Sequence, residues 1–225
     1  MIELEEVRKA FNQGRPNELW AVRGISLSLP LKGLHVLKGP SGSGKTTLLA
    51  MIGCLSRPTA GRIRLDGRLI SNLPERFMTE VRRATFGFVF QQFNLIRGLS
   101  VLDNVMLPAY PLAPNAGELR RRALALLDRF GIAARAGHKA EWLSGGEAQR
   151  AAVCRAMIND PRILIADEPT ANLDSQRSQE LLAVLGELVA MGKTVLVSSH
   201  DPLVFGSAGV SHLVELHDGR LVGAA

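Results

Sequence analysis

The 225-residue chain has few cysteines and no cysteine pattern typical of a metal or redox site. Its two cysteines, Cys54 and Cys154, belong to no CxxC pair and to no Cys/His ligand spacing. Both lie in apolar, helix-like stretches, so we expect small core residues in a reducing compartment. With 46% hydrophobic residues, the chain can bury a substantial core without disulfides, and we expect one globular domain.

Long apolar runs are absent as well. Polar residues end even the most apolar stretches, 163–166 and 195–197, far short of the roughly 18 residues of a membrane-spanning helix. The chain begins MIELEE, which is acidic and strand-like, whereas a secretory leader is basic and then apolar. We therefore expect a protein that is not exported and that, if it acts at a membrane, acts from beside it.

Dense charge of one sign is also rare. The net charge of +6 would suit nucleic acid or an anionic membrane surface, but it is spread along the chain. The densest cluster, arginines 120–122, lies in a helical pattern whose apolar stripe is buried and which Gly131 ends. We interpret these arginines as a solvated helix face, and we expect no nucleic-acid partner.

Apolar, β-favouring runs alternate with helical patterns, which predicts an α/β fold with a largely parallel central sheet. The four runs that read as buried strands are residues 34–37, 86–90, 163–166 and 195–198. Three alternating stretches, which predict an antiparallel β layer on the same core, are residues 2–7, 22–29 and 62–65. Residues 212–222, with Asp218-Gly219 at their centre, predict a final hairpin.

The stretch from Leu99 to Met157 is mostly helical, with prolines and a glycine making one irregular part at 108–117. We therefore predict a helical subdomain at about 99–158, carried by a catalytic core with the β layer at about 1–98 and 159–225. Together these parts form a single domain over residues 1–225.

One segment matches the phosphate-loop pattern GxxxxGK[ST] and lies between a buried strand and a helical pattern, which is the context that the motif requires. It consists of Gly39, Pro40, Ser41, Gly42, Ser43, Gly44, Lys45 and Thr46, and the helix continues from Thr47. Glycines let backbone N–H groups approach phosphate, Lys45 places a cation on the β- and γ-phosphates, and the Thr46 hydroxyl can ligate Mg²⁺. A glycine-rich turn that merely begins a helix is the alternative.

Two carboxylates, Asp167 and Glu168, follow the apolar run 163–166. We predict that Asp167 holds Mg²⁺ and that Glu168 polarises the attacking water as general base. Paired acidic residues are common where any helix begins, so this prediction depends on the phosphate loop beside it.

A second phosphate platform is predicted at Ser144-Gly145-Gly146 within the segment LSGGE. Ser144 and Glu147 have the spacing of a capping box, so the segment also starts a helix. A capped helix N-terminus with two adjacent glycines is well suited to phosphate. Because the chain already has a complete phosphate loop, the second platform indicates a nucleotide held by another subunit.

These motifs, together with Gln91, the loop ANLD at 171–174 and His200, stand in the order of ATP-binding-cassette (ABC) ATPases, and essentially the whole chain resembles that family. The resemblance implies a P-loop NTPase fold of the ABC type, ATP and Mg²⁺ as cofactors, and ATP hydrolysis. It also implies a head-to-tail homodimer with ATP at the interface, in which the LSGGE segment of one copy closes over ATP held by the other.

Four residues take their roles from the resemblance, and each has a structural alternative. Gln91 would contact Mg²⁺ or the attacking water, or it is only the polar end of a strand. Asp174 would cross the dimer interface, or it caps the next helix. His200 would touch the γ-phosphate, or it is a hydrated loop residue. Phe11 would stack on adenine, or it is a buried staple.

Residues 86–96 and 103–108 resemble the branch that includes lipoprotein-release, macrolide-efflux and cell-division ATPases. This resemblance implies a peripheral protein on the cytoplasmic face of the membrane, coupled to a separate permease-like membrane subunit in transport or mechanical work. Three residues depart from the family pattern. Arg97 stands where many relatives carry proline, in the region expected to meet the membrane partner. Trp142 packs on a partner or in the core, and Lys38 reaches solvent or phosphate. An ABC ATPase that acts on nucleic acid or ribosomes, and a scaffold that binds nucleotide without hydrolysis, are the alternatives.

Overall fold

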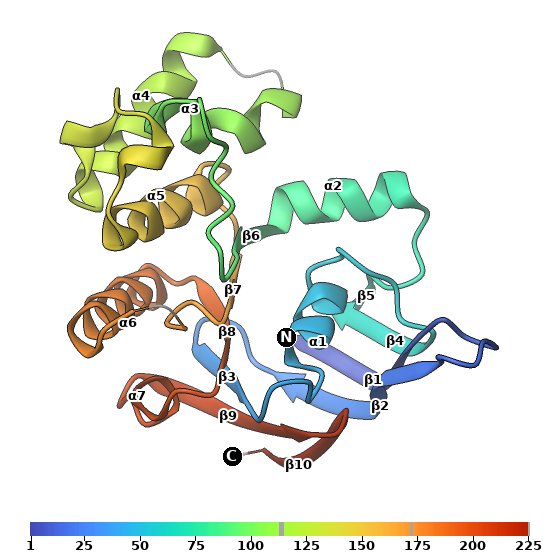
Figure 1. Ribbon diagram of the computed structural model, residues 1–225. Coiled ribbons are helices and arrows are strands. Elements are labelled where there is room, and N and C mark those ends of the chain that lie inside the picture. The colour runs from blue at the N-terminus through green and yellow to red at the C-terminus, as the bar shows by residue number, and fades with distance from the viewer. Residues whose placement is uncertain (113–114, 172, 225) are drawn as a thin grey trace.

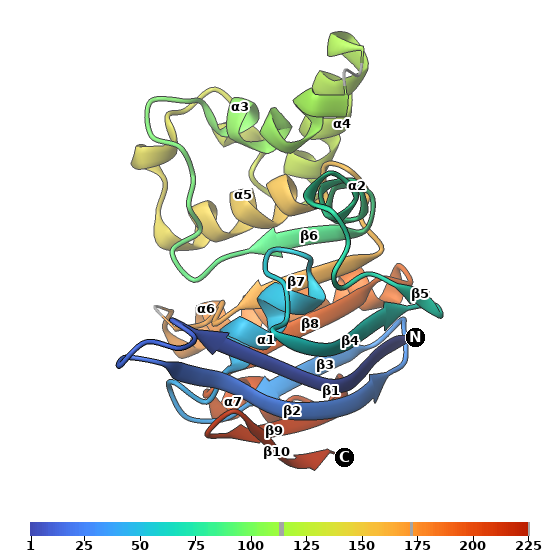
Figure 2. The ribbon, with the colours of Figure 1, turned by 90° about the vertical axis from the view of Figure 1, so that its right-hand side faces the viewer.

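Two β-sheets with one helix between them form the centre of the computed structural model, which describes residues 1–112, 115–171 and 173–224 (Figure 1). The strand order is β2-β1-β4-β5 in the smaller sheet and β10-β9-β3-β8-β7-β6 in the larger one. Helix α1 (Lys45–Ile52) lies between the two sheets (Figures 1 and 2). Its apolar side chains are buried all round because both sheets pack on it.

The larger sheet has five parallel strands and one antiparallel edge strand, β10. Its strands are β3 (Leu34–Lys38), β6 (Phe86–Val89), β7 (Ile163–Asp167), β8 (Thr194–Ser199), β9 (Val210–His217) and β10 (Arg220–Ala224). The predicted α/β fold with a largely parallel sheet is confirmed. Since the carboxyl ends of parallel strands meet at one edge, the segments after β3, β6, β7 and β8 converge there.

The smaller sheet is antiparallel, as its alternating sequence predicts, and turns its apolar residues towards α1. Its strands are β1 (Ile2–Phe11), β2 (Leu19–Leu29), β4 (Ala60–Leu65) and β5 (Arg68–Leu69). Strand β5 pairs with β4 across a hairpin turn at Asp66-Gly67, as the sequence predicts, whereas α2 (Glu75–Thr85) is an element that the sequence pattern does not predict. Nearly half of the residues of α2 are charged, and its narrow apolar stripe buries only Met78.

Helices α5 (Gly145–Met157) and α6 (Ser175–Ala190) pack on the other face of the larger sheet, with the short α7 (Pro202–Phe205) beside β9. Helices α3 (Val101–Met106) and α4 (Ala116–Arg129), with the 3₁₀ turns η1 (Leu107–Leu112), η2 (Ala133–Arg135) and η3 (Ala140–Trp142), project from β6 as a lobe (Figure 2). None of the helices in the described ranges is both long and apolar enough to cross a bilayer.

Both cysteines are buried, as the sequence predicts. Burial raises the pKa of Cys54 to about 11 and that of Cys154 to about 12, so neither thiol ionises near neutral pH. Trp142, in contrast, is 71% exposed, and its alternative placement in the core is therefore wrong. The ammonium group of Lys38 lies 3.2 Å from the Glu215 carboxylate and above the Phe205 ring.

A fully buried histidine lies in the core beside a second histidine. His35 on β3 faces His212 on β9, with ring centroids 5.1 Å apart. Its Nε2 donates to the Pro30 carbonyl at 2.7 Å. Burial, opposed by this hydrogen bond and helped by His212, lowers the pKa of His35 to about 4.

We expect the free energy of unfolding to fall as the pH drops from about 6.5 towards 4. The unfolded chain binds a proton at His35 near the ordinary pKa of 6.5, whereas the folded chain does not until about 4. The unfolded state therefore binds more protons in this window, which removes on the order of 3 kcal/mol of stability. Urea denaturation at several pH values across this range measures the change of the free energy of unfolding with pH. This change should be smaller for His35→Gln than for the exposed control His217→Gln. An equal change in the two variants would contradict the assignment.

Candidate functional site

A hollow of about 340 Å³, which we call the first hollow, opens at the carboxyl edge of the larger sheet. Segments that are far apart in the sequence meet there because they follow β1, β3, β6, β7 and β8. Its lining residues are Phe11, Leu19, Ala21, Ser41, Gly42, Ser43, Gly44, Lys45, Thr46, Thr47, Gln91, Glu168 and His200. Most of the residues predicted from the phosphate-loop side of the site are thus brought together.

The loop between β3 and α1 requires glycine at its two ends. At Gly39 a Cβ atom would lie 2.1 Å from the Leu216 carbonyl oxygen, and at Gly44 it would lie 2.3 Å from that of Ala21. Gly44 also has a φ of 97°, which L side chains rarely adopt. Both positions therefore let the backbone pass where any side chain would collide, and α1 begins directly at Lys45 with its N–H groups at the hollow.

The side chain of Lys45 folds back over its own loop. Its Nζ donates to the carbonyls of Gly39 at 2.7 Å and Pro40 at 3.1 Å, and these two residues do not line the hollow. Ser43 is 2% exposed, and its hydroxyl has no hydrogen-bond partner within the described ranges. A buried donor without a partner, beside a cation and a helix N-terminus, fits the oxygens of a phosphate.

Three charged or polar groups form a chain across the hollow. Lys45 Nζ lies 3.3 Å from Glu168 Oε1, and the two side chains are only 5% and 13% exposed. The other oxygen of Glu168 is 2.9 Å from His200 Nδ1. Since an ionised carboxylate can only accept, the imidazole donates this bond. Glu168 is therefore held from both sides.

The backbone of Glu168 is strained. Its φ is 45°, in the left-handed region that non-glycine residues rarely occupy. The peptide N–H of Glu168 donates to the Ser198 hydroxyl at 2.9 Å, which fixes this conformation from the neighbouring strand β8. Strain of this kind persists only where the surroundings hold it, and it commonly marks a functional side chain.

Oxygen donors suited to Mg²⁺ lie at the edge of the hollow. Thr46 Oγ1 donates to Asp167 Oδ1 at 2.8 Å, and the Ser198 hydroxyl donates to the same oxygen at 2.6 Å. Mg²⁺ takes hard oxygen ligands, and a hydroxyl with a carboxylate is a usual part of its shell beside phosphates. Thr46 and Asp167 therefore fit the predicted metal, while Gln91 lines the hollow without a described hydrogen bond to either.

Phe11 ends β1 at the rim of the first hollow and is 43% exposed, so the alternative of a buried staple is wrong. Lys9 Nζ lies 5.3 Å from the centroid of its ring, and the adenine role of Phe11 stays a prediction. Leu19 and Ala21, which line the same hollow from β2, are not among the residues predicted from the sequence. The pairing of Phe11 with Leu19 in the antiparallel sheet brings them there.

The predicted second platform lies elsewhere, in a second hollow of about 310 Å³. Its lining residues are Ser144, Gly146, Arg150, Asp174, Gln176, Arg177 and Glu180. No residue lines both hollows. The structure therefore does not bring Ser144, Gly145, Gly146 and Asp174 to the phosphate loop of the same chain.

Ser144 and Asp174, which the sequence predicts as possible helix caps, are the N-caps of α5 and α6. Ser144 Oγ accepts from the Glu147 N–H, and Glu147 Oε2 accepts from the Ser144 N–H, which completes the capping box of α5. Hydrogen bonds from Arg135 and then Ser144 lower the pKa of Glu147 to about 2, so this carboxylate stays ionised. Asp174 caps α6 through the Arg177 N–H, while Asn172 of the same loop lies outside the described residues.

The segment after Gln91 is fastened to α5. The Arg155 guanidinium donates to the carbonyls of Phe93 at 2.5 Å and Asn94 at 2.6 Å. Phe93 and Asn94 both have positive φ values, 57° and 49°, so the arginine holds a strained turn. The helix that begins at the second platform is thereby linked to the segment that leaves the first hollow.

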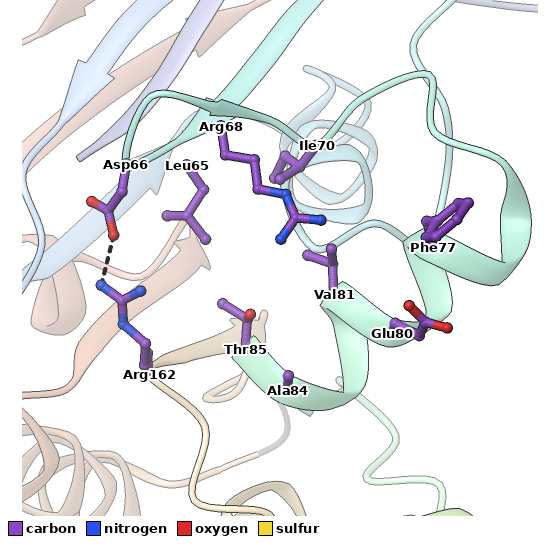
Figure 3. Close-up of a pocket in the computed structure, with 10 residues that line it drawn as sticks. All are labelled: Leu65, Asp66, Arg68, Ile70, Phe77, Glu80, Val81, Ala84, Thr85 and Arg162. Atoms are coloured by element: carbon purple, nitrogen blue, oxygen red, sulfur yellow. Dashed lines mark hydrogen bonds and ion pairs between the residues drawn. The ribbon is translucent and has the colours of Figure 1, made fainter.

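Two other hollows lie outside the predicted site. One of about 490 Å³ lies between the β4–β5 hairpin and α2, where Arg162 pairs with Asp66 at 2.7 Å (Figure 3). The third hollow, about 420 Å³, lies between α2, β6 and η1, with an apolar floor and a rim of arginines. None of the predicted site residues lines either.

Comparison with known proteins places the chain among ATP-binding cassettes. A family model described as "ABC transporter" matches residues 22–171. The macrolide export ATP-binding/permease protein MacB of Hyphomonas neptunium is 40% identical over 222 residues, which are 99% of this chain and 34% of that protein. The chain thus spans about a third of the length of the first curated relatives it matches. An uncharacterized ABC transporter ATP-binding protein of Thermotoga maritima is 40% identical over 99% of this chain and 94% of its own length.

A solved structure is similar over the whole chain. It is the dimeric structure of a post-hydrolysis state of the ATP-binding cassette MJ0796 bound to ADP and Pi, with a TM-score of 0.91 and 37% sequence identity. The similarity covers 100% of this chain and 98% of that one. The resemblance predicted from the motifs is confirmed, and so is the fold that it implies.

Proposed function

The chain belongs to the ABC transporter family, and from this premise we propose that two copies of it bind and hydrolyse ATP between them and drive a membrane permease. We further propose that the permease is a separate chain, that Mg²⁺ accompanies ATP, and that the protein is peripheral on the cytoplasmic face of the membrane. The transported substrate is left open, because the described site handles only nucleotide.

The observation that carries this proposal is the separation of the two hollows. The first hollow supplies a phosphate loop and carboxylates, and the second supplies a glycine-flanked helix N-terminus, but no residue lines both. The binding site for a nucleotide in the first hollow is complete only when the second hollow of another copy faces that nucleotide. A two-fold dimer makes this pairing twice, which gives two equal composite sites.

The residues of the first hollow divide the reaction among them. The backbone of residues 39–44 and Lys45 hold the phosphates, and Phe11 stacks on the base. Glu168 takes a proton from the attacking water, and His200 orients that carboxylate through its 2.9 Å contact. Thr46, Asp167 and Gln91 would hold Mg²⁺, which neutralises phosphate charge when bound. Products leave when the dimer reopens.

Closure of the proposed dimer is transmitted to the helical lobe through the contacts of Arg155. Gln91 lines the first hollow, and the segment after it is fastened by Arg155 to α5, which begins at the second platform. Movement of either element relative to β6 therefore moves the other. This supports transmission of the ATP state to the lobe of α3, α4 and η1–η3.

The third hollow is our proposed docking site for a cytoplasmic segment of the permease. It lies directly beside the linked segment, since Asn94 and Arg155 line it, and its floor includes Phe88, Phe90 and Pro111. The relative MacB is named as an ATP-binding/permease protein, which supports a membrane partner.

Co-expression with a candidate permease should bring the chain into the membrane pellet. Salt-dependent DNA binding without membrane recruitment would favour the nucleic-acid alternative.

Complementation between two inactive variants tests the composite site. Lys45→Ala disables the phosphate loop, and Gly145→Asp places a carboxylate at the second platform. Each variant alone should lack ATPase activity, whereas a mixture should recover up to about a quarter of the native rate, because half of the dimers keep one intact site. Mixing Lys45→Ala with Glu168→Gln, both defective in the same hollow, is the control. Failure of the first mixture to exceed this control would refute composite sites.

A further inference from the structure

An arginine lies over the glycine pair at the start of α5. Arg177, in the first turn of α6, comes within 3.8 Å of the position of a Cβ atom at Gly145 through its Nη1. Its Cδ is 3.9 Å from the corresponding position at Gly146. The guanidinium and the first backbone N–H groups of α5 therefore share one surface, inside the second hollow.

The guanidinium of Arg177 is held only loosely. Its Nε lies 3.5 Å from Asp174 Oδ2, and the side chains are 47% and 59% exposed, so this ion pair is weak. The other oxygen of Asp174 is occupied by the helix cap. Across the described parts of the chain, no hydrogen bond from the Arg177 guanidinium is formed, whereas the neighbouring Arg150 donates to Glu180.

The first hollow is short of positive charge for the substrate that we propose. Among the described residues that line it, Lys45 is the sole lysine or arginine, and its ammonium already faces Glu168 at 3.3 Å. A triphosphate carries several negative charges, and more charge gathers on its outer oxygens in the transition state. The proposed Mg²⁺ would offset part of this charge, and the second hollow carries a further cation for the outer phosphate oxygens.

We infer that Arg177 is a further phosphate ligand, which donates to the terminal phosphate of ATP held by the other copy. This inference rests on the proposed function, because only a dimer brings that phosphate to the second hollow. A guanidinium matches two phosphate oxygens with parallel donors, and in a site closed to water this contact strengthens as charge develops. Arg177 thus acts from the side opposite Lys45, in both binding and hydrolysis.

The test measures ATP-driven dimerisation in a Glu168→Gln parent, by sedimentation velocity with MgATP. Adding Arg177→Gln should weaken dimerisation by about tenfold to a hundredfold, since a charged hydrogen bond is lost at each site. Arg177→Lys should recover part of the loss, because an ammonium keeps the charge without the fork. Arg121→Gln, the same change at an exposed arginine of α4, is the matched control and should leave the parent unchanged.

A second measurement separates a phosphate contact from a general effect on the fold. With Glu168 intact, Arg177→Gln should lower kcat and the trapping of MgADP by vanadate. Its affinity for MgADP as a monomer and its melting temperature should match the native protein, because the first hollow contains no part of Arg177.

Four outcomes would overturn the inference. If the Arg177→Gln variant dimerised as strongly as the Arg121→Gln variant and the parent, Arg177 would not contact the phosphate. An equal loss of dimerisation in both variants would show an effect of net charge instead. A matching loss of monomer affinity for MgADP would place the effect in the fold. If the Glu168→Gln parent itself stayed monomeric with MgATP, the proposed function would fall together with the inference. A parent that dimerises, with a variant that does so equally well, defeats the inference alone.

Discussion

Replacing Glu168 by glutamine should lower ATP turnover by about a thousandfold while ATP binding and ATP-driven dimerisation persist. Glutamine has nearly the shape of glutamate, but its amide cannot take a proton from water, so the general-base contribution is lost. Both halves of the composite site otherwise stay in place. Phosphate release at saturating ATP gives the rate, and size-exclusion chromatography with MgATP gives the dimer.

The matched control for this variant is Glu215→Gln. Glu215 lies on β9 of the same sheet and forms an ion pair with Lys38, the residue directly before the phosphate loop. It lines neither the first nor the second hollow. Its replacement removes a carboxylate near the loop without touching the proposed chemistry, so the rate should stay within about twofold of native. Turnover at native speed by Glu168→Gln would show that another group activates the water.

Replacing Lys45 by alanine should weaken ATP binding by about a hundredfold or more and abolish turnover. The ammonium group supplies charge-assisted hydrogen bonds to the phosphates, and no other lysine or arginine among the described residues lines the first hollow to replace it. Equilibrium binding of a fluorescent ATP analogue to the monomer measures the loss. Affinity within about threefold of native would mean that the backbone of the loop suffices.

Lys45→Ala has a second consequence, which a double variant separates from the first. Glu168 is 13% exposed, and without Lys45 it is a buried carboxylate with only His200 beside it. The single variant should therefore also lose stability, because an uncompensated buried charge is costly. Lys45→Ala combined with Glu168→Gln should regain much of this stability but none of the ATP affinity. Recovery of binding in the double variant would contradict the assigned role of Lys45.

The central strands could be predicted because their runs are apolar on both faces, as at 163–166, which helices and a second sheet cover. The convergence of residues 45, 91, 168 and 200 follows from the same pattern, since parallel strands end at one edge. The helix starts at Ser144 and Asp174 could be predicted from local capping chemistry. These features depend on short stretches of sequence and on a simple rule of topology.

Contacts between distant segments could not be predicted in this way. Leu19 reaches the first hollow only through the register of β1 and β2, which contains bulges that the alternation does not reveal. The position of Arg177 over Gly145 depends on how α6 packs beside α5. Helix α2 was not predicted because nearly half of its residues are charged and it buries only Met78, although it borders two of the hollows.

The ion pair between Lys45 and Glu168 makes the resting site its own competitor. In the proposed function, the ammonium that receives the phosphates is already paired with the carboxylate that activates the attacking water. An incoming nucleotide therefore has to displace a side chain of the protein. The same displacement separates Glu168 from its cation, so in this proposal Glu168 can act as a base only in a copy that holds ATP. Such coupling would limit reaction in the absence of bound ATP, and it would make the affinity for ATP lower than that of a phosphate loop whose lysine is unpaired.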